Sequence, residues 1–411
     1  MKYVRTHETR DKFLADKDST SRGFRLAPTL YKYSDESEDE DNRDHIYLEL
    51  DDPRKHEGST YMEIALNSDV EFSFYIGNKS GDKQTTMTCT IDWGDDTVET
   101  KTITKDTYGF KLAHNYVAGS YKIELYDVER DYSVVGSNTR IESLISHPSS
   151  VKRVVLGEEV VSIIAAAFFE CTSLTSVYIP ESVTSIGYWT FWRCYSLTSI
   201  YIPKSVTSIA GGMLDNCPSL ISIYIPESVT SIGYSAFAYC ESLKSIYIPE
   251  GVTTIYNRVF CNCTSLISIY IPESVTSIGY TAFDNCTSLK SINIPKGVTT
   301  IDRYTFYNCR SLTSIYIPER VTTINQYAFY NCKSLKSIDI PEKVTSIGDS
   351  AFQGCSSLTS ISSFNPTTPT LGGNIFLDLP TNGTLHIKPG VTGYDAWLSK
   401  LPEGWRIVED L

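Results

Sequence analysis

Cysteine is the residue type in this chain with the most evident capacity for chemistry. Nine of the eleven cysteines recur at intervals of 23 residues, and these are Cys171, Cys194, Cys217, Cys240, Cys263, Cys286, Cys309, Cys332 and Cys355. Stacked strands lie about 4.8 Å apart, which is within the Cα range of a disulfide. However, the Cβ atoms of residues in register point the same way and not toward one another. Because buried cysteine packs as a small hydrophobic residue, we expect free, buried thiols.

The other reactive residues give little support to metal binding or catalysis. Cys261-Asn262-Cys263 is a single pair, and no histidine lies between His147 and His386 to complete a zinc site or a Ser-His-Asp triad. The sequence has no phosphate-binding glycine loop and no HExxH motif. The repeats have identical lengths, so no insertion is available to form a pocket. We predict a protein that is not an enzyme and has no cofactor and no metal.

A second series of residues suits binding better than catalysis. One position between two apolar strand positions is mainly tyrosine, with Asn293 and Asp339 as exceptions. The tyrosines are Tyr178, Tyr201, Tyr224, Tyr247, Tyr270 and Tyr316. One interpretation is an aromatic ladder that stabilises a sheet. The other is a stripe on the concave face that binds a partner, since tyrosine combines a rigid ring with a hydroxyl group suited to sugars and proteins. The sequence leaves both interpretations open.

Both series follow from a 23-residue repeat that runs from Cys171 to about Ser363. Its clearest mark is the dipeptide Ile-Pro, which occurs eight times in register from Ile179-Pro180 to Ile340-Pro341. A fixed period in this range is typical of a solenoid, in which each unit contacts only its neighbours. One repeat buries too few side chains to offset the entropy lost on ordering it. Stacking must therefore supply the difference, and both ends of the stack need caps.

Within a repeat, the apolar pattern predicts two short extended segments. Val177 and Ile179 alternate with polar residues, Pro180 ends this strand, and the β-branched run 183–186 predicts a second strand. The next position is mostly Gly, Asp or Asn, which tolerate positive φ, so we expect a left-handed turn there. That position holds Gly187, Gly233, Gly279 and Gly348, but also Ala210 and Tyr256, where we expect local adjustment.

The pattern L-x-x-I-x-I-P…V-T-S-I-G…A-F-x-x-C resembles the BspA-like, or Treponema-type, leucine-rich repeat over roughly residues 148–363. The resemblance implies that the first strand forms a parallel sheet on the concave side and that the A-F-x-x-C piece forms the outer wall. The expected fold class is mainly β with short helical turns, a leucine-rich-repeat solenoid preceded by a small β-sandwich.

Residues 59–128 read as alternating strands, with Met62, Ile64 and Leu66 on one buried face. The segment Ile91-Asp92-Trp93-Gly94-Asp95-Asp96 and the strand 114–125 resemble the PKD family, a small Ig-like sandwich that serves as a spacer or adhesion module. Asp92, Asp95 and Asp96 could be metal ligands, but we expect them to shape a turn by accepting hydrogen bonds from nearby backbone N–H groups.

The remaining segments form the ends of the chain. Residues 1–58 read as a polar arm with an acidic run at 35–44, and residues 129–170 as the cap and first repeat of a solenoid that spans 129–363. Residues 364–411 resemble the closing segment of BspA-like proteins, with a last strand, a short helix and a Gly-Trp strand. We expect Trp397 and Trp405 to cover the open end of the core.

Charge and hydropathy narrow the possible partners. The net charge of −13 and the pI near 5.0 argue against nucleic acid, whose binders need a basic surface. No apolar run is long enough to cross a membrane. The N-terminal residues lack the apolar core of a signal peptide, so we expect synthesis in the cytoplasm and action on the exterior of a virion or cell.

Three functions are consistent with these observations. The first is a binding or adhesion protein on an exterior surface that recognises a protein or glycan receptor through the solenoid face. The second is a bacteriophage virion or tail protein, in which residues 1–58 attach to other virion proteins and free thiols reflect a reducing cytosol. The third is a passive structural spacer.

Overall fold

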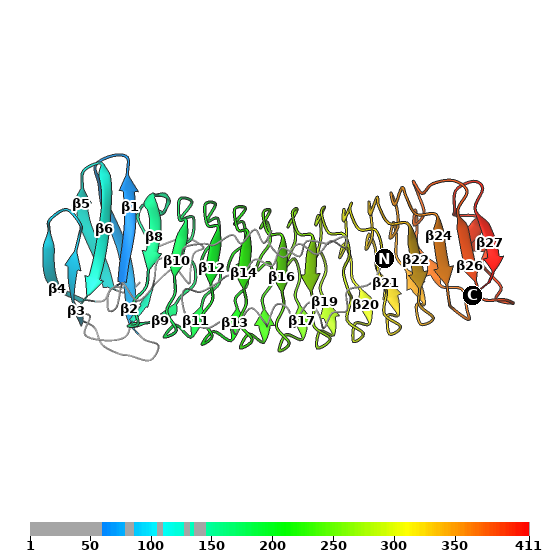
Figure 1. Ribbon diagram of the computed structural model, residues 1–411, viewed down its shortest axis with the longest axis horizontal. Helices are drawn as coiled ribbons and strands as arrows, with labels where there is room; N and C mark the ends of the chain where they lie inside the picture. Colours follow the sequence, from blue (N-terminus) through cyan, green and yellow to red (C-terminus); the bar gives the residue numbers. More distant parts are fainter. Residues whose placement is uncertain (1–59, 79–85, 105–109, 127–131, 135–144, 411) are drawn as a thin grey trace, which may run out of the picture.

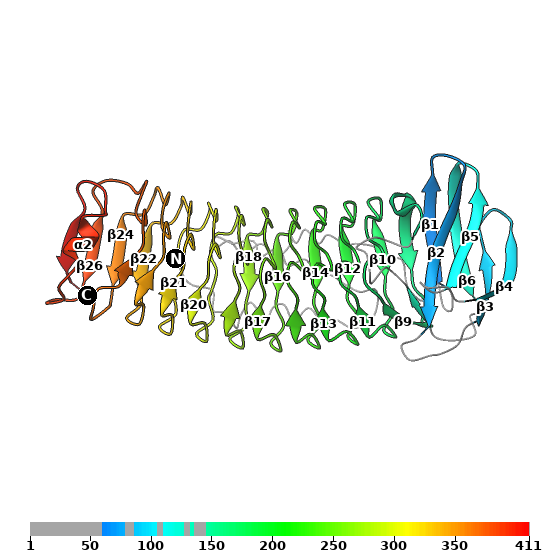
Figure 2. The same cartoon turned by 180° about the vertical axis from the view of Figure 1, so that it is seen from behind.

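The computed structural model describes residues 60–78, 86–104, 110–126, 132–134 and 145–410 of the 411-residue chain. These residues form a long rod of stacked coils with a β-sandwich at one end and a closing turn at the other (Figure 1). The view from behind shows the same two rows of short strands along the rod (Figure 2). The predicted polar arm, 1–58, lies outside the described residues.

The N-terminal unit consists of antiparallel strands from two sheets. They are β1 Thr60–Leu66, β2 Val70–Asn78, β3 Thr86–Asp92, β4 Val98–Thr104, β5 Phe110–Tyr116, β6 Gly119–Tyr126 and β7 Tyr132–Val134. Strand β1 pairs with β6, and β2 pairs with β5. The alternating side chains Met62, Ile64 and Leu66 are buried, as the sequence pattern predicts, because period-two alternation places every second side chain on the core face.

Both sheets of this unit continue into the solenoid. Strand β1 pairs on its other edge with β8, Val151–Val155, and β8 pairs in parallel with β10, Ser176–Tyr178. In the second sheet, β7 pairs with β9, Val160–Ile163, which pairs in parallel with β11, Ser185–Ile186. The sandwich therefore covers the first coil through backbone hydrogen bonds and shares one hydrophobic core with the repeats.

The first row of coil strands carries the Val/Ile-x-Ile-Pro motif and continues in parallel from coil to coil. After β10 its strands are β12 Ser199–Tyr201, β14 Ser222–Tyr224, β16 Ser245–Tyr247, β18 Ser268–Tyr270, β22 Ser337–Ile340, β24 Ser360–Ser363, β26 Thr384–Ile387 and β27 Arg406–Glu409. Up to β24 the register offset is 23 residues, so Ser199 aligns with Ser222. Identical repeat positions therefore superpose along the rod.

The second row consists of two-residue strands at the Ser/Thr-Ile motif. After β11 they are β13 Ser208–Ile209, β15 Ser231–Ile232, β17 Thr254–Ile255, β19 Ser277–Ile278, β20 Thr300–Ile301, β21 Thr323–Ile324, β23 Ser346–Ile347 and β25 Thr370–Leu371. A short 3₁₀ helix, η2 Pro148–Ser150, enters the first coil. The two predicted extended segments are confirmed in most repeats, but around Asn293 and Tyr316 the first segment is reduced to an isolated bridge.

The third side of each coil is an outer wall without strands. Its N–H groups donate to the next coil, as Phe168 does to the Thr190 carbonyl oxygen and Phe191 to that of Met213, both at 2.9 Å. Two residues in each coil have positive φ, for example Tyr304 at 57° and Asn308 at 56°. Since asparagine tolerates this conformation, its recurrence just before the cysteine is a sequence signal for this turn.

The left-handed turn predicted at Gly187, Gly233, Gly279 and Gly348 is wrong, because none of these glycines has a positive φ. They are glycine for a different reason. A Cβ at Gly233 would lie 2.5 Å from the Gly211 backbone nitrogen, and one at Gly279 would lie 2.7 Å from that of Asn257. The position therefore brings one coil close to the backbone of the preceding coil.

Stacked phenylalanines and cysteines fill the core behind the outer wall. Phe283 and Phe306 stack at 5.7 Å with 3° between their planes, and similar pairs continue from Phe237 to Phe352. All eleven cysteines are free and buried, as the sequence predicts. Eight thiols also donate to a carbonyl oxygen 26 residues earlier, as Cys286 does to Phe260 at 3.2 Å.

The C-terminal segment closes the core as the sequence predicts. Strand β26 pairs with β27, and the helix α2, Asp395–Leu398, lies between them in sequence. Trp397 and Trp405 are buried, and their indole N–H groups donate to the carbonyl oxygens of Pro369 and Pro380. These bonds satisfy the polar end of each ring, so the two indoles can cover the last coil.

Candidate binding surface

The predicted tyrosine stripe occupies one repeat position along the first row of strands. In β12–β14 Tyr201 is in register with Tyr224, and in β16–β18 Tyr247 is in register with Tyr270. An isolated parallel bridge joins Asn293 to Tyr316. Tyr178 ends β10 at the equivalent place. We call Tyr178, Tyr201, Tyr224, Tyr247, Tyr270 and Tyr316 the sheet-face tyrosines.

Several sheet-face tyrosines are held by specific contacts. The rings of Tyr247 and Tyr270 stack with centroids 5.1 Å apart and 7° between their planes. The hydroxyl of Tyr270 donates to a carboxylate oxygen of Glu250 at 2.7 Å, and that of Tyr201 donates to Glu181 at 2.6 Å. Tyr316 is the most open of the series, at 50% exposure, whereas Tyr247 is buried, at 5%, and not outward-facing as expected. The stripe therefore combines fixed rings with one strongly exposed ring.

The glutamates that follow Ile-Pro are the partners that sequence reasoning missed. Glu181 accepts the Tyr201 hydroxyl on one oxygen and the backbone N–H of Lys204 on the other, at 2.9 Å. Glu273 accepts the N–H of Lys296 at 3.1 Å. The signal for these contacts in the sequence was the glutamate that recurs directly after Ile-Pro, as at Glu181 and Glu273. Each such glutamate contacts the next coil and so supports the register.

Burial and these carboxylates keep the phenols protonated. Burial, followed by the hydrogen bond to Glu181, raises the pKa of Tyr201. Burial, followed by the charges of Glu227 and Glu250, raises the pKa of Tyr247 in the same way. Both phenols are therefore neutral over the physiological pH range, with Tyr247 buried and Tyr201 partly exposed.

The acidic turn in the N-terminal unit has a structural role. Asp92 accepts the N–H of Gly94 at 2.8 Å, and Asp95 accepts that of Thr97 at 3.2 Å, as predicted for turn-shaping residues. Asp95 also pairs with His114 at 2.8 Å. Burial raises the pKa of Asp95, but hydrogen bonds from His114 and Thr97 outweigh it and lower that pKa. These aspartates are engaged in holding the turn.

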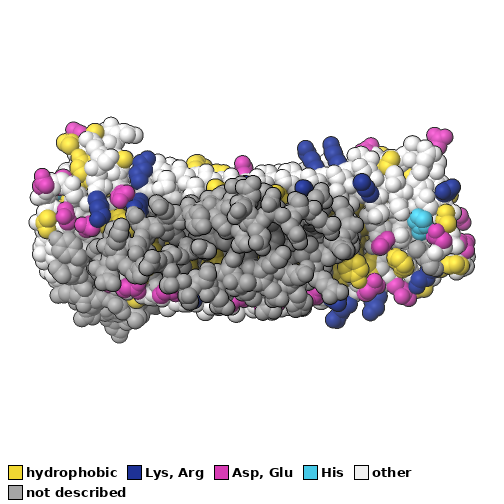
Figure 3. Space-filling model, in the orientation of Figure 1, with side chains coloured by type: hydrophobic (Ala, Val, Ile, Leu, Met, Phe, Trp, Pro, Cys, Tyr) yellow, Lys and Arg dark blue, Asp and Glu magenta, His cyan; other side chains and the backbone are white. Residues whose placement is uncertain are grey.

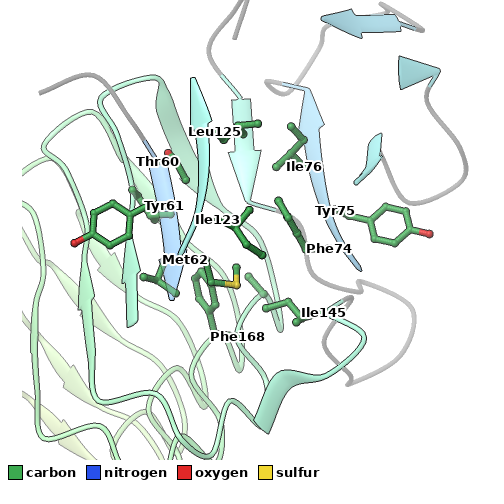
Figure 4. A pocket seen from close by; sticks show the side chains of 13 residues that line it. Thr60, Tyr61, Met62, Phe74, Tyr75, Ile76, Ile123, Leu125, Ile145 and Phe168 are labelled. Atoms are coloured by element: carbon green, nitrogen blue, oxygen red, sulfur yellow. The ribbon is translucent and has the colours of Figure 1, made fainter. Parts of the chain in front are cut away.

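No cluster of three or more His, Cys, Asp or Glu side chains suited to a metal ion occurs within the described ranges. The same part of the chain contains no helix with the length and apolar character needed to span a bilayer. A small apolar cavity of about 30 Å³ lies where the sandwich meets the first coil, between Met62, Phe74 and Phe168 (Figure 4). It has room for about one water molecule and belongs to the core of the junction.

The coil geometry and the repeat pattern define a leucine-rich-repeat solenoid. Residues 139–267 and 253–381 match the family described as BspA type leucine rich repeat region (6 copies). These stretches cover more than half of the 411 residues, so the chain belongs to the BspA-type leucine-rich repeat family. The match begins at residue 139, and the PKD resemblance of residues 59–128 stays a prediction. No curated protein matches the chain.

Solved structures of bacterial repeat proteins are similar to this chain. A leucine rich cell surface protein from Faecalibacterium prausnitzii is 29% identical over 52% of this chain and 79% of that chain, with a TM-score of 0.32. A Treponema pallidum leucine rich repeat protein is 28% identical over 50% and 84%, with a TM-score of 0.35. The pneumococcal vaccine antigen PcpA is 16% identical over 64% and 80%, with a TM-score of 0.42. The family assignment rests on the repeat match and not on these superpositions.

Proposed function

We propose that this protein is a non-catalytic binding protein of the adhesion type. It acts on an exterior surface and recognises a protein or glycan partner through the sheet-face tyrosines. The observation that supports this most directly is the alignment of Tyr201 with Tyr224 and of Tyr247 with Tyr270 on neighbouring strands. A stacked backbone holds these rings before a partner arrives, which lowers the entropic cost of binding.

The chemistry of the stripe supports a partner rich in hydrogen-bond donors. The phenol oxygens of Tyr201 and Tyr270 lie beside the carboxylates of Glu181 and Glu250. Such an arrangement suits sugar hydroxyl groups or basic side chains, which can donate to the carboxylates while an apolar face contacts the rings. The net charge of −13 also favours partners that are neutral or basic.

The hypothesis of a phage virion protein depends on residues 1–58 as an attachment arm, and this segment lies outside the described residues. If the protein were a passive spacer, the tyrosine stack would stabilise the solenoid, but replacing its exposed side chains would abolish no binding. Neither alternative gains support from a specific contact in the described part of the chain, so the binding protein is our proposal.

The test is a screen of the full chain against glycan arrays and candidate host proteins. We expect a partner that binds the wild type and loses at least tenfold in affinity for the double variant Tyr201→Ser/Tyr224→Ser. Tyr195→Ser, which removes a tyrosine that is 40% exposed outside the stripe, is the matched control. Equal binding by all three proteins, with unchanged melting temperatures, would show that the sheet-face tyrosines do not bind the partner and serve only as a structural ladder.

A further inference from the structure

Four tyrosines form a cluster on the outer wall of two neighbouring coils. Tyr304 and Tyr307 belong to one coil, and Tyr327 and Tyr330 occupy the same repeat positions 23 residues later. All four side chains are partly exposed. The coils on either side carry no aromatic residue at these two positions, so the cluster is confined to two coils. We call these four residues the tyrosine quartet.

The rings of the quartet stack from one coil to the next. The ring centroids of Tyr307 and Tyr330 lie 4.8 Å apart with 5° between the planes. Those of Tyr304 and Tyr327 lie 4.9 Å apart with 17° between the planes. Within a coil the rings are tilted and farther apart, as for Tyr304 and Tyr307 at 5.5 Å. Because equal repeat positions superpose in stacked coils, each phenol lies closest to its counterpart in the neighbouring coil.

The quartet combines this close stacking with access to solvent. Within the described ranges no hydrogen bond to a protein group holds the four hydroxyls, and none of them is buried. Other stacked tyrosines differ. Tyr116 and Tyr121 are 4.4 Å apart, but Tyr116 is buried and its hydroxyl donates to the Trp93 carbonyl oxygen. Tyr247, which stacks on Tyr270 at 5.1 Å, is also buried.

The thiols nearest in sequence to the quartet are sealed from this surface. Cys309 and Cys332 are fully buried, and burial raises the pKa of both thiols. Since the thiolate is the reactive form of cysteine, these groups are poor electron donors to a radical at the surface. All eleven cysteines are free, so no disulfide links one coil to another. The exposed phenols are therefore the groups through which neighbouring coils can become covalently joined.

We propose that the tyrosine quartet is a site of oxidative cross-linking, at which a tyrosine of one coil couples to its counterpart in the next, Tyr307 to Tyr330 or Tyr304 to Tyr327. The oxidant is hydrogen peroxide consumed by a haem peroxidase. The site shares no residue with the sheet-face tyrosines, so this proposal stands or fails separately from the proposed function.

The coupling step balances without any further reactant. Each of two phenols gives up one electron and one proton, and one molecule of hydrogen peroxide is reduced to two molecules of water. The two phenoxyl radicals join through a carbon–carbon bond between ring carbons ortho to the hydroxyls. Each of these carbons then loses its hydrogen as a proton, while each phenol oxygen takes up a proton from solvent. The product is dityrosine, which contains two hydrogen atoms fewer than the two tyrosines.

The charge around the quartet favours coupling within one chain. Arg303, Arg310 and Lys333 lie beside the quartet in sequence and are exposed. Lys and Arg side chains also project from both edges of the rod toward its C-terminal end (Figure 3). Two copies that met through this wall would bring like charges together. A link within the chain closes a loop between neighbouring coils and restricts the unfolded state, as a disulfide does, so it should raise the melting temperature.

The test treats the dilute full chain with a haem peroxidase and limiting hydrogen peroxide, followed by denaturation and digestion. Trypsin cleaves after Arg and Lys, so residues 304–310 and 321–333 are released as separate peptides, each with two tyrosines of the quartet. We expect these two peptides to be joined, at their summed mass less two hydrogen atoms, with the fluorescence of dityrosine. The joined pair should come from protein that remains monomeric on a denaturing gel.

Phenylalanine variants show whether the phenols are responsible. Tyr327→Phe/Tyr330→Phe keeps the rings but removes both phenols from one coil, so it should lower the yield of joined peptides at least tenfold. Tyr188→Phe/Tyr234→Phe is the matched control, because it alters an exposed pair whose centroids lie 6.4 Å apart, and it should give the wild-type yield.

Three results would overturn the proposal, and the peptide map of the wild type is sufficient to detect each of them. One is the absence of the joined pair in protein whose other tyrosines have been oxidised. Another is a joined pair that occurs only in covalent dimers of the chain. The third is a loss of two hydrogen atoms within a single peptide, which would place the bond inside one coil.

Discussion

The thiol of Cys217 donates a hydrogen bond of 3.1 Å to the carbonyl oxygen of Phe191, which lies 26 residues earlier in the chain. The acceptor belongs to the preceding coil, next to the stacked phenylalanines. The same contact recurs at neighbouring coils, as from Cys240 to Leu214 and from Cys355 to Phe329. A small, buried donor at this position therefore joins each coil to the one before it, which explains a cysteine in every repeat.

The buried thiols should be unreactive until the protein unfolds. Burial raises the pKa of every thiol in the 23-residue series, that of Cys355 to about 12, and it raises the pKa of Cys261 to about 11. Because only the thiolate reacts, a thiol reagent at pH 8 should label native protein very slowly and all eleven cysteines after denaturation. Fast labelling of several thiols in protein that remains folded would contradict the sealed core.

The same pKa shifts predict a loss of stability at alkaline pH. The unfolded thiols ionise near pH 8.5, while the folded thiols keep their protons to a much higher pH. The contribution of the protonated thiols is therefore complete below about pH 8.5 and declines as the pH rises toward the raised folded values. Denaturant midpoints should be level from pH 7 to about pH 8.5 and should fall from there to pH 10.5. A flat profile would show that the thiols ionise equally in both states.

The close approach of neighbouring coils predicts a position-specific penalty for alanine. In Gly348→Ala the new Cβ would meet the backbone nitrogen of Gln326 in the preceding coil, so we expect a cost of about 1–3 kcal/mol. Gly373→Ala is the control, since the nearest atom to its Cβ would be 3.7 Å away. Urea unfolding of both variants measures the difference, and equal stability of the two would reject this explanation of the glycine position.

Two partly buried carboxyl groups on the outer wall should weaken the fold at neutral pH. Burial raises the pKa of Asp215 to about 6 despite the nearby Arg258 and Arg193, and burial raises that of Asp284 to about 6. Stability from the protonated form is present below about pH 4 and is lost as the pH rises through 6. Asp215→Asn should therefore raise the melting temperature at pH 8 and leave it nearly unchanged at pH 4.

An exposed carboxyl group provides the comparison for this effect. Asp339 lies on β22 with its side chain exposed, so Asp339→Asn should alter the melting temperature little at either pH. A lower melting temperature of Asp215→Asn at pH 8 would show that its charge is compensated by the arginines.

The C-terminal cap should hold the last coils together. Trp397 is 1% exposed and packs on Phe376 with ring centroids 5.8 Å apart. Its removal in Trp397→Ala should cost about 3–5 kcal/mol. Because each coil is stabilised only by its neighbours, hydrogen exchange should increase first in β26 and β27 and much less in the N-terminal sandwich. A uniform increase along the rod would argue against local capping.

The repeat pattern was sufficient to predict the coil core, because the alternation of buried and exposed side chains along a strand is determined by a few neighbouring residues. Val177, Ile179 and Phe191 are buried where their spacing places them. The glycine position was misinterpreted since its constraint comes from another coil, and a single repeat contains no trace of that contact. The left-handed residues of the outer wall, such as Asn308 and Asn331, carried a signal in their residue type.

The candidate site was only partly accessible to sequence reasoning. The in-register tyrosines follow directly from the period, but their bonds to glutamates such as Glu181 depend on how the chain turns after Ile-Pro. The contact between Tyr188 and Tyr234 was not foreseen, because these residues occur in alternate repeats and only the stacked coils bring their rings to 6.4 Å.

Hydroxyl-radical footprinting of the full chain, with and without a partner from the screen, is the most direct test of recognition through the sheet-face tyrosines. It reports the solvent access of individual tyrosines. We predict that the partner protects Tyr316, which is 50% exposed on the sheet face, together with Tyr178, while Tyr195 remains equally reactive. Saturating partner that leaves Tyr316 and Tyr178 fully reactive would contradict recognition through the sheet-face tyrosines.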